Sequence, residues 1–427
     1  MDLNALHPKE QIVKILQRIY DFGMTTTSGG NISILDENGD TWITPSAVDK
    51  GTLRTDDIIK VCKDGTIEGL HKPSSEYPFH KAIYQKRPDI RAIIHAHPPS
   101  LVTFSIVRQT PDTSVIAQAN FICGEVGYAK YKLPGSDELG ESIANTFQEG
   151  YNCVLMENHG TVVGGTDLSD TFQKFETLEF CAKTILEGKK IGEVKSLTEK
   201  QLGLFTGKVN PFEAFVHTNA TIKEKHLRGE LCKVVKRAYQ QRLIISTYGT
   251  FSARLDENDF IITPFGKDRY YLEREELVLI KDGKYEKGKN PSRSAELHQH
   301  IYKKYPEINC ILTAQSPSAS AYCITHSTLN THTIPESYVL LREIPSVRFG
   351  DQFQGGAEIA KAVGKETPIL LIENDSILVT GASILETFDR LEVAEFSARS
   401  LTQATILGDM VPIEEQEIED IKTKFLS

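Results

Sequence analysis

The sequence lacks the features that mark membrane, secreted and nucleic-acid-binding proteins. No apolar run approaches the roughly 18 residues that a membrane-spanning helix needs, and the opening MDLNALHPKEQIVKIL has no basic region, apolar core and cleavage site of a secretory signal. Lysine and arginine (48) are outnumbered by aspartate and glutamate (58), and the net charge of −10 argues against a basic nucleic-acid-binding face. We therefore expect a cytoplasmic protein that binds neither nucleic acid nor membranes.

Cysteines are few and irregularly spaced. There are seven of them, an odd number, and no two form a C-x-x-C pair, so the sequence predicts neither a disulfide framework nor a zinc knuckle. We interpret them as buried thiols of a reducing compartment. Glycine-rich phosphate loops are also missing: there is no P-loop, and no G-x-G-x-x-G follows a predicted strand, which gives no support to nucleotide binding.

What the chain does have is the length and composition of two globular domains. Its 427 residues exceed the roughly 100–200 residues of an ordinary domain. Hydrophobic residues make up 40% of the chain and charged residues 25%. This balance supplies sizeable cores and excludes a disordered or fibrous chain.

The second half of the sequence is a diverged copy of the first half. Six blocks recur in the same order, and the offset between matched blocks drifts only from 219 to 216 residues. The matched pairs include Tyr20 with Tyr239, Gly30 with Gly249, Thr44 with Thr263, His80 with His298, Tyr84 with Tyr302, Phe172 with Phe388, and Phe180 with Phe396. Such an ordered series is not expected by chance, and we infer a tandem duplication.

The duplication predicts two domains, one over residues 1–205 and the other over residues 218–427. A stretch around residues 196–225 has weak periodicity and contains Gly203, Gly207 and Pro211, as a linker would. Because each copy alternates helix and strand patterns, the expected class is α/β or α+β.

Comparison of the two copies separates residues of the fold from residues of a site. His80 recurs as His298, so we interpret it as structural. Four residues that could bind a metal do not recur: Glu76, His95, His97 and His159 stand opposite Ser294, Thr313, Gln315 and Asp375. Their joint loss is what the removal of one site would produce.

The three histidines are placed where they could bind one ion. His95 and His97 belong to AIIHAH, an apolar run that ends at two prolines and is typical of a buried strand, in which residues two apart share a face. His159 follows a second apolar strand and precedes Gly160, which permits a tight turn. An isolated H-x-H is more often a pair of core or turn histidines. Combined with His159 and Glu76, it predicts a metal site of the catalytic zinc type.

Glu76 opens a predicted helix, EYPFHKAIYQKR, for which Ser75 is the expected N-cap. An acid in the first turn suits the helix dipole, but beside a metal the same carboxylate can ligate or move a proton. Neighbouring polar turns predict an anion site. Gly30 and Asn31 offer backbone N–H groups and an amide, while Ser74 and Ser75 offer hydroxyls at a helix N-terminus.

These residues make the first half of the chain similar to the class II aldolase and adducin family, and most of all to zinc-dependent ketose-1-phosphate aldolases of the fuculose phosphate type. The motifs that carry the resemblance are GNIS at 30–33, ITPS at 43–46, PSSE at 73–76, HAH at 95–97 and ENHG at 157–160. The second half resembles the same fold with its site removed.

The resemblance implies two tandem α/β domains, each with three α/β/α layers and a mainly antiparallel central sheet. It implies a metal held by His95, His97 and His159 with Glu76, zinc being expected first and manganese, cobalt or iron as alternatives. Phosphate contacts would fall to Ser28, Gly30, Asn31, Ser46, Ala47, Ser74 and Ser75. Because family members usually form oligomers, we expect a homo-oligomer in which first and second domains are in contact.

The activity implied is cleavage of a ketose 1-phosphate, of the fuculose or rhamnulose phosphate type, to dihydroxyacetone phosphate and an aldehyde, with Glu76 moving protons. Alternatives within the family are pentulose-5-phosphate 4-epimerases and sugar-acid phosphate decarboxylases or dehydratases. The alternative that is not an enzyme is an adducin-like assembly protein. The second copy could also bind an anionic effector through Lys267, Arg269 and Arg293.

Two departures from the family pattern bear on this expectation. Ala47 occupies a position where the family often has glycine and where backbone approaches phosphate. The stretch IAQANFICGEV contains no tyrosine, although fuculose-type enzymes carry a proton-donating tyrosine there. The proton donor is therefore open, and Tyr128 and Tyr131 are the tyrosines close by in sequence.

Overall fold

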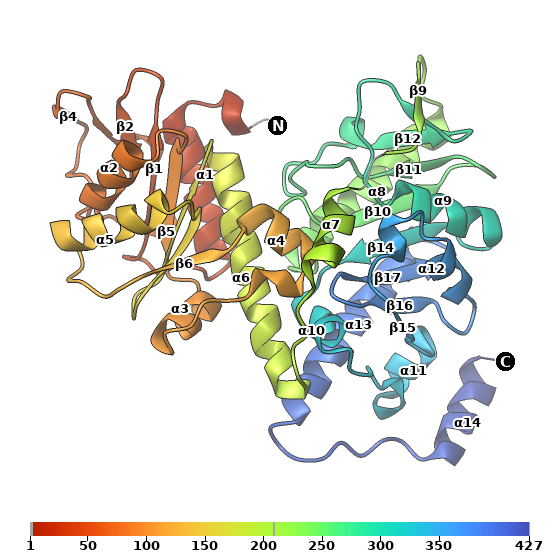
Figure 1. The fold of residues 1–427 in the computed structure, drawn as a ribbon. Helices are drawn as coiled ribbons and strands as arrows, with labels where there is room; N and C mark the ends of the chain where they lie inside the picture. The colour runs from red at the N-terminus through yellow and green to blue at the C-terminus, as the bar shows by residue number, and fades with distance from the viewer. Residues whose placement is uncertain (1–2, 208–209, 427) are drawn as a thin grey trace. The chain divides into compact units, whose positions relative to one another are not determined.

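The computed structural model describes residues 3–207 and 210–426 (Figure 1). These residues divide into two compact units. The first unit comprises residues 3–113 and 119–183, and the second unit comprises residues 114–118 and 184–426 apart from 208 and 209. The domain boundaries 1–205 and 218–427 stay a prediction.

The first unit is built around an eight-stranded sheet in the order β4-β3-β2-β1-β5-β8-β7-β6. Neighbouring strands are antiparallel, except that β6 and β7 are parallel. The strands are β1 Asn31–Leu35, β2 Thr41–Ile43, β3 Ile59–Val61, β4 Ile67–Glu68, β5 Ala92–Ala96, β6 Val126–Ala129, β7 Cys153–Met156 and β8 Thr161–Gly165. The strand that carries His95 is therefore central, with β1 on one side and β8 on the other.

Helices cover both faces of this sheet. On one face α2 and α5 bury a core that includes Ile93, Val154 and Val162. On the other face α1 packs against β1, and its Arg18 guanidinium lies 4.3 Å from the Phe172 ring of α6. The helices that lie in or enter this unit are α1 Pro8–Asp21, α2 Tyr77–Lys86, α3 Pro99–Ile106, α4 Ala117–Cys123, α5 Asp137–Gln148 and α6 Leu168–Ile191. The predicted three-layer α/β/α fold is confirmed.

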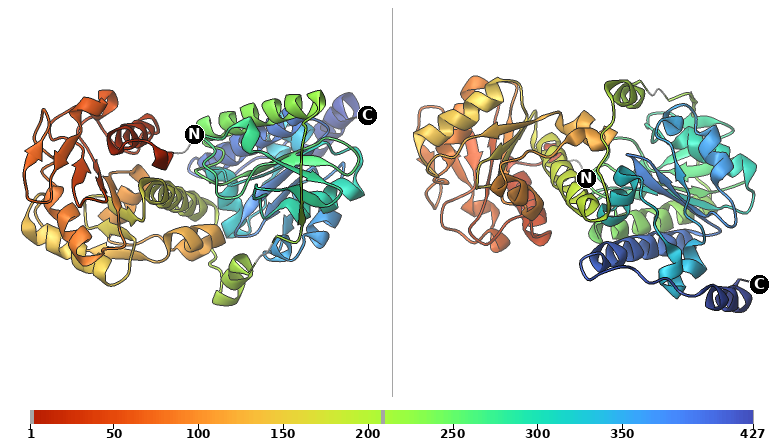
Figure 2. Two further views of the ribbon diagram at one scale, coloured as in Figure 1. Left: turned by 90° about the horizontal axis from the view of Figure 1, so that it is seen from above. Right: turned by 60° about the horizontal axis from the view of Figure 1, so that its bottom comes forward.

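The second unit has a nine-stranded sheet in the order β15-β16-β17-β14-β10-β11-β12-β13-β9. Its strands are β9 Glu213–Phe215, β10 Thr250–Arg254, β11 Phe260–Ile262, β12 Val278–Lys281, β13 Lys284–Glu286, β14 Cys310–Ala314, β15 Ser346–Val347, β16 Ile369–Ile372 and β17 Ser376–Gly381. Its helices are α7 Glu199–Thr206, α8 Ile222–Gln240, α9 Ala295–Lys304, α10 Pro317–Thr325, α11 Pro335–Leu341, α12 Ala357–Ala362, α13 Ile384–Ala404 and α14 Glu415–Phe425. The long helices α8 and α13 lie side by side on one face of the sheet (Figure 2).

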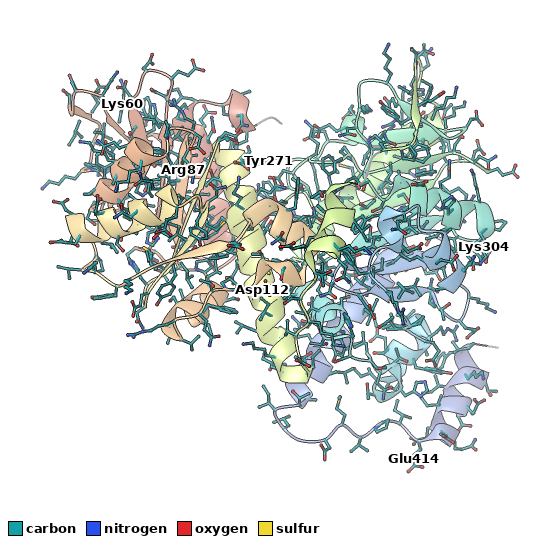
Figure 3. All side chains as sticks on the ribbon, in the orientation of Figure 1. Lys60, Arg87, Asp112, Tyr271, Lys304 and Glu414 are labelled. Carbon is teal, nitrogen blue, oxygen red and sulfur yellow. The ribbon has the colours of Figure 1, made fainter. Side chains whose placement is uncertain are left out.

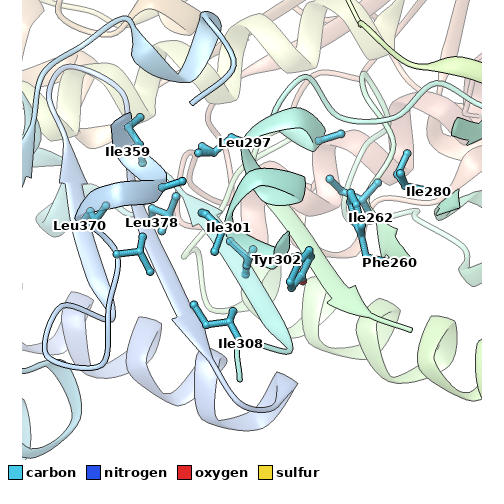
Figure 4. Packing of buried hydrophobic residues seen from close by; sticks show 14 of the residues in the cluster. Phe260, Ile262, Ile280, Leu297, Ile301, Tyr302, Ile308, Ile359, Leu370 and Leu378 are labelled. Carbon is cyan, nitrogen blue, oxygen red and sulfur yellow. The ribbon is translucent and has the colours of Figure 1, made fainter. Parts of the chain in front are cut away.

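The opposite face of the second sheet carries its hydrophobic core (Figure 4). Phe260 and Ile262 alternate along β11, so both point to this face. Leu297 and Ile301 of α9 pack against them, and Ile359 of α12 extends the cluster. The second unit therefore has the same three layers as the first unit.

The two sheets have one topology. Read from β13 to β15, the second sheet repeats the strand order of the first sheet from β4 to β6. The register repeats as well, since Ser33 lies opposite Ile43 and Ser252 lies opposite Ile262. The tandem duplication is confirmed. Among the described residues, strand β9 has no counterpart in the first sheet. It lies with α7 in the stretch interpreted as a linker, and elements of three and eight residues are too short for periodicity to reveal.

Charged side chains are exposed and the cysteines are free, as expected from the composition. Charged side chains such as Lys304 and Glu414 are exposed (Figure 3). All seven cysteines are free, and six of them are buried, whereas Cys62 is half-buried. Within the described ranges, no helix combines the length and the apolar character that crossing a membrane requires.

Candidate metal centre

Three imidazoles from neighbouring strands meet at one end of the first sheet. His95 lies on β5, His97 follows directly after that strand, and His159 lies in the turn between β7 and β8. Antiparallel pairing of Ala96 with Thr161 brings the end of β5 beside this turn. One ligand nitrogen from each ring lies within 4.8 Å of the other two. The structure thus brings together the three histidines that the sequence singled out, although β5 ends at Ala96 and does not extend through His97.

The close packing of these rings requires glycine at two positions. A Cβ on Gly160 would lie 2.6 Å from both the Ala96 carbonyl oxygen and the His97 ring. Gly30 has a φ of +73°, and a Cβ there would lie 2.8 Å from the His95 carbonyl oxygen. A side chain at either position would force the ends of the strands apart.

The histidines are neutral, so their lone pairs are available to a metal. Burial lowers the pKa of His95 to about 3, and burial with the adjacent His95 and His159 lowers the pKa of His97 to about 3. The pKa of His159 is also lowered, first by burial. His95 Nδ1 donates to the Thr161 carbonyl oxygen at 2.9 Å, which leaves the lone pair on Nε2.

Glu76 lies beside the histidines. Its Oε2 is 3.3 Å from His95 Nε2, and its Oε1 is 3.8 Å from His159 Nε2. The prediction that Ser75 caps helix α2 is wrong, because the helix begins at Tyr77 and Glu76 is its N-cap residue. Even so, the Glu76 side chain makes no capping hydrogen bond. The carboxylate points to the imidazoles instead of satisfying its own helix.

The donor set fits a divalent metal. Zinc bonds of about 2.0–2.2 Å in a tetrahedral site separate neighbouring ligand atoms by roughly 3.3 Å. Three separations are near this value: 3.1 Å between the Nε2 atoms of His95 and His97, and the 3.3 and 3.8 Å from Glu76. Three neutral imidazoles and one carboxylate also suit manganese, cobalt or iron.

The residues expected to contact phosphate come from loops that main-chain hydrogen bonds tie together. Ser46 N donates to the Lys72 carbonyl oxygen at 2.9 Å. Ser74 N donates to the Thr44 carbonyl oxygen at 3.1 Å. Ser28, Ala47 and Ser75 are exposed, Ser46 and Ser74 are half-buried, and Gly30 and Asn31 are buried. The loops therefore meet, and their contacts with phosphate stay a prediction.

Lys50 supports these loops, and the sequence reasoning missed it. It is buried, and its ammonium donates to the Pro45 carbonyl oxygen at 2.8 Å. Its backbone N–H donates to the Thr27 carbonyl oxygen at 2.9 Å. In the second unit, Arg269 donates to the Pro264 carbonyl oxygen at 3.0 Å. Both copies have a cation at this position, Lys50 at the end of VDK and Arg269 at the end of KDR. This recurrence is the signal that assigns Lys50 to the fold.

Asn31 makes two contacts that were not expected from the sequence. Its Nδ2 donates to Glu76 Oε2 at 2.7 Å, and its Oδ1 accepts a hydrogen bond from His80 Nε2. The sequence reasoning placed Asn31 at the phosphate and did not connect His80 with the site. The spacing of Glu76, His80 and Tyr84 along one helical stripe is the signal that could have found it.

The three cations considered for an effector in the second unit are already engaged. Arg269 is fully buried among backbone carbonyls, and Lys267 lies 3.2 Å from Glu276. Arg293 donates to the Phe205 carbonyl oxygen at 3.0 Å, and its guanidinium lies 3.8 Å from the Phe205 ring. These contacts do not support an effector site formed by the three residues.

The chain is similar to a known protein family and to known enzymes. The family model described as the class II aldolase and adducin N-terminal domain matches residues 10–186 and again residues 229–402. The chain is 34% identical over 197 residues to a 5-deoxy-D-ribulose 1-phosphate aldolase of Bacillus thuringiensis, a match that covers 45% of this chain and 91% of that protein.

Two further relatives match to a similar extent. An L-fuculose phosphate aldolase of Methanocaldococcus jannaschii is 36% identical over 180 residues, which are 42% of this chain and 95% of the relative. A 3-oxo-tetronate 4-phosphate decarboxylase of Haemophilus influenzae is 31% identical over 206 residues, which are 47% of this chain and 98% of the relative. Less than half of this chain thus matches nearly the whole of each relative.

Proposed function

Because the chain belongs to the class II aldolase and adducin family, we propose that its first unit is a metal-dependent lyase that cleaves a ketose 1-phosphate to dihydroxyacetone phosphate and an aldehyde. The observation that carries the proposal is the convergence of three neutral imidazoles with the Glu76 carboxylate. The named aldolases among the relatives support the substrate class.

His95, His97 and His159 would hold the metal with Glu76 beside them, and zinc is the metal that we propose. When bound, such a metal acts as a Lewis acid on a substrate carbonyl and favours the negative charge that develops next to it. The His95–Thr161 hydrogen bond fixes the tautomer that presents Nε2 to the site.

Glu76 would move the proton. Cleavage of the C3–C4 bond needs the C4 hydroxyl to lose its proton, and a carboxylate with only 14% of its side chain exposed can accept that proton beside the substrate. The electron pair of the broken bond passes to C3, and C4 leaves as an aldehyde. Return of a proton to C3 then gives dihydroxyacetone phosphate.

The loops around Ser28, Ser46 and Ser74 would hold the phosphate. Their hydroxyls and backbone N–H groups can donate to an anion without any cation of their own. With a net charge of −10, the chain has no overall positive electrostatic potential to attract phosphate. We therefore assign phosphate binding to these local donors.

A sugar-acid phosphate decarboxylase is the second candidate, because the decarboxylase relative is matched over 98% of its length. Loss of carbon dioxide leaves the same kind of charge beside a carbonyl, so the same ligands would serve. The two reactions differ in their need for a base, since decarboxylation removes no hydroxyl proton. Replacement of Glu76 should therefore harm the aldolase reaction more.

The test uses zinc-loaded protein with two substrate panels. Ketose 1-phosphates are assayed for dihydroxyacetone phosphate and aldehyde, and 3-oxo sugar-acid phosphates are assayed for carbon dioxide. We expect aldehyde release, reduced about 100-fold or more in Glu76→Gln and unchanged in Ser294→Ala, the matched position of the second unit. Carbon dioxide release alone would favour the second candidate. No turnover by a fully zinc-loaded protein on either panel would reject both.

A further inference from the structure

A series of hydrogen bonds runs from the core of the first unit to the Glu76 carboxylate. The Tyr84 and Ser33 hydroxyl oxygens lie 2.7 Å apart, and Ser33 Oγ lies 2.7 Å from His80 Nδ1. His80 Nε2 contacts Asn31 Oδ1, and Asn31 Nδ2 lies 2.7 Å from Glu76 Oε2. Asn31 is only 2% exposed, and Ser33 and His80 are fully buried, so water does not compete for these groups.

The fold explains the alignment. Asn31 and Ser33 are two apart on β1 and point to the same face of the sheet. Glu76, His80 and Tyr84 are four apart and follow one stripe of helix α2, which packs on that face. Residues two apart on the strand therefore face residues four apart on the helix, and polar side chains from the two elements alternate along the series.

The donor direction is the same along the whole series. A carboxylate only accepts, so Asn31 Nδ2 donates to Glu76 and Asn31 Oδ1 faces His80. His80 must then donate from Nε2, and burial lowers the pKa of this imidazole to about 3, so it is neutral and Nδ1 accepts from Ser33. Ser33 in turn accepts from Tyr84, whose pKa burial raises. Each member therefore holds the next in a single orientation.

The second unit keeps only the inner part of this series. Ser252 Oγ lies 2.7 Å from His298 Nδ1 and 2.7 Å from the Tyr302 hydroxyl, as in the first unit. His298 Nε2, however, has no hydrogen-bond partner among the described residues. Thr250 replaces Asn31, and its hydroxyl pairs with Ser292 instead. The inner part serves the fold in both copies, whereas the link to a carboxylate exists only beside the metal ligands.

We propose that Asn31, oriented by His80, is the positioning residue that holds Glu76 toward the histidines, so that Oε2 is occupied and Oε1 is left to exchange a proton with the substrate. This inference rests on the proposed function and deepens it by naming the residue that positions the Glu76 base. Without the Asn31 amide, Oε2 loses its 2.7 Å hydrogen bond, and the carboxylate is free to turn away from the imidazoles.

The test compares matched variants of the two units loaded with Co²⁺, whose visible spectrum responds to nearby ligands. Asn31→Ala and His80→Phe remove the link to Glu76, and Thr250→Ala and His298→Phe make the equivalent changes in the second unit. Glu76→Gln supplies the reference for a displaced carboxylate. His80→Gln retains an N–H donor and serves as a partial rescue. We expect altered cobalt spectra in Asn31→Ala and His80→Phe, and wild-type spectra in both second-unit variants.

Activity gives the second readout. We expect kcat to fall about 100-fold in Asn31→Ala, with KM changed less than threefold, because the base is misplaced while the phosphate loops are intact. The order of kcat should be wild type, then His80→Gln, then His80→Phe. A wild-type cobalt spectrum and wild-type kcat in Asn31→Ala would overturn the inference. A tenfold or greater rise in KM at unchanged kcat would also overturn it, since Asn31 would then act in phosphate binding.

A third readout separates this inference from the proposed function. In metal-free protein labelled with ¹⁵N-histidine, His80 should have its proton on Nε2, in slow exchange with water, and Asn31→Ala should speed that exchange at least tenfold. His298 is the internal control and should not respond to Asn31→Ala. If no sugar phosphate is turned over, the proposed function fails while these spectra still decide the inference. A His80 protonated on Nδ1 would reject the series even in an active enzyme.

Discussion

At the residue scale, buried imidazoles make the stability of the metal-free protein depend on pH. Burial lowers the pKa of four histidines, His80, His95, His97 and His298, to about 3, below the ordinary 6.5 that applies to the unfolded chain. Their contribution is therefore fully present above pH 6.5 and is lost as pH falls from 6.5 toward 3, because the unfolded state binds more protons. Between pH 7.5 and 5.5 we expect a loss of about 1 kcal/mol per histidine in urea unfolding.

The control for this prediction is His298→Gln. The variant removes one titrating imidazole that contacts no proposed ligand. Below pH 6.5, the number of protons taken up on unfolding should therefore be smaller by about one, and the unfolding free energy should depend less steeply on pH. The same loss of stability at pH 5.5 with and without His298 would contradict the assignment. A wild-type protein equally stable at pH 7.5 and 5.5 would contradict it for all four.

A second residue-scale prediction concerns Ala47. Its φ of 58° is left-handed, and the matched Gly266 has a φ of +70°. Because the Ala47 side chain is exposed, Ala47→Gly loses no packing and relieves backbone strain, and we expect about 0.5–1 kcal/mol of stabilisation in urea unfolding. Gly266→Ala should destabilise by a similar amount, since a Cβ there would meet no atom within 4 Å and only the backbone changes. Equal signs for the two variants would contradict this explanation.

The candidate ligands could be named from the sequence because none of the four, Glu76, His95, His97 and His159, recurs in the second copy. The connection through His80 was missed, because the spacing along the helix shows only one side of it, and Asn31 and Ser33 join it by tertiary contacts from a strand. The N-cap at Ser75 was wrongly predicted, since local preference favours serine there while the helix begins one residue later.

At the element scale, the start of helix α3 is anchored by one carboxylate. Glu179 accepts hydrogen bonds from the backbone N–H groups of Ser100 at 3.2 Å and Leu101 at 3.1 Å, just after His97. Glu395 holds the start of α10 in the same way. We expect Glu179→Ala and Glu395→Ala each to cost about 2–4 kcal/mol in urea unfolding, because buried N–H groups lose a charged acceptor.

Of these two substitutions, only Glu179→Ala should change zinc binding. Glu179→Ala frees the segment that follows His97, so we expect weaker zinc binding, measured by competition with a chromophoric chelator. Glu395→Ala should bind zinc as the wild type does. Equal zinc affinities in the two variants would show that α3 does not position His97.

The sequence predicted the elements that carry strong periodicity, and the duplicated order of strands follows from them. It did not reveal α7 and β9. Strand β9 gains its stability by parallel pairing with β13, where Lys284 lies opposite Glu213, and such a contact is not a local property of residues 213–215.

At the scale of the whole molecule, one fold occurs twice, and the first copy has the candidate metal ligands. The two sheets share their strand order, and the second unit has Thr313, Gln315 and Asp375 where the first has histidines. The second unit has this topology without the three histidines, so the topology does not depend on them. The expected homo-oligomer stays a prediction that light scattering of the full chain can test.

The most direct test of the account is the metal content per chain, by elemental analysis of protein purified without added metal or chelator. We predict one zinc per chain, absent from a His95→Ala, His97→Ala double variant and retained in a Thr313→Ala, Gln315→Ala double variant of the second unit. No metal, even after zinc is supplied, would contradict the metal centre. Two metals per chain would contradict the assignment of a single site to the first unit.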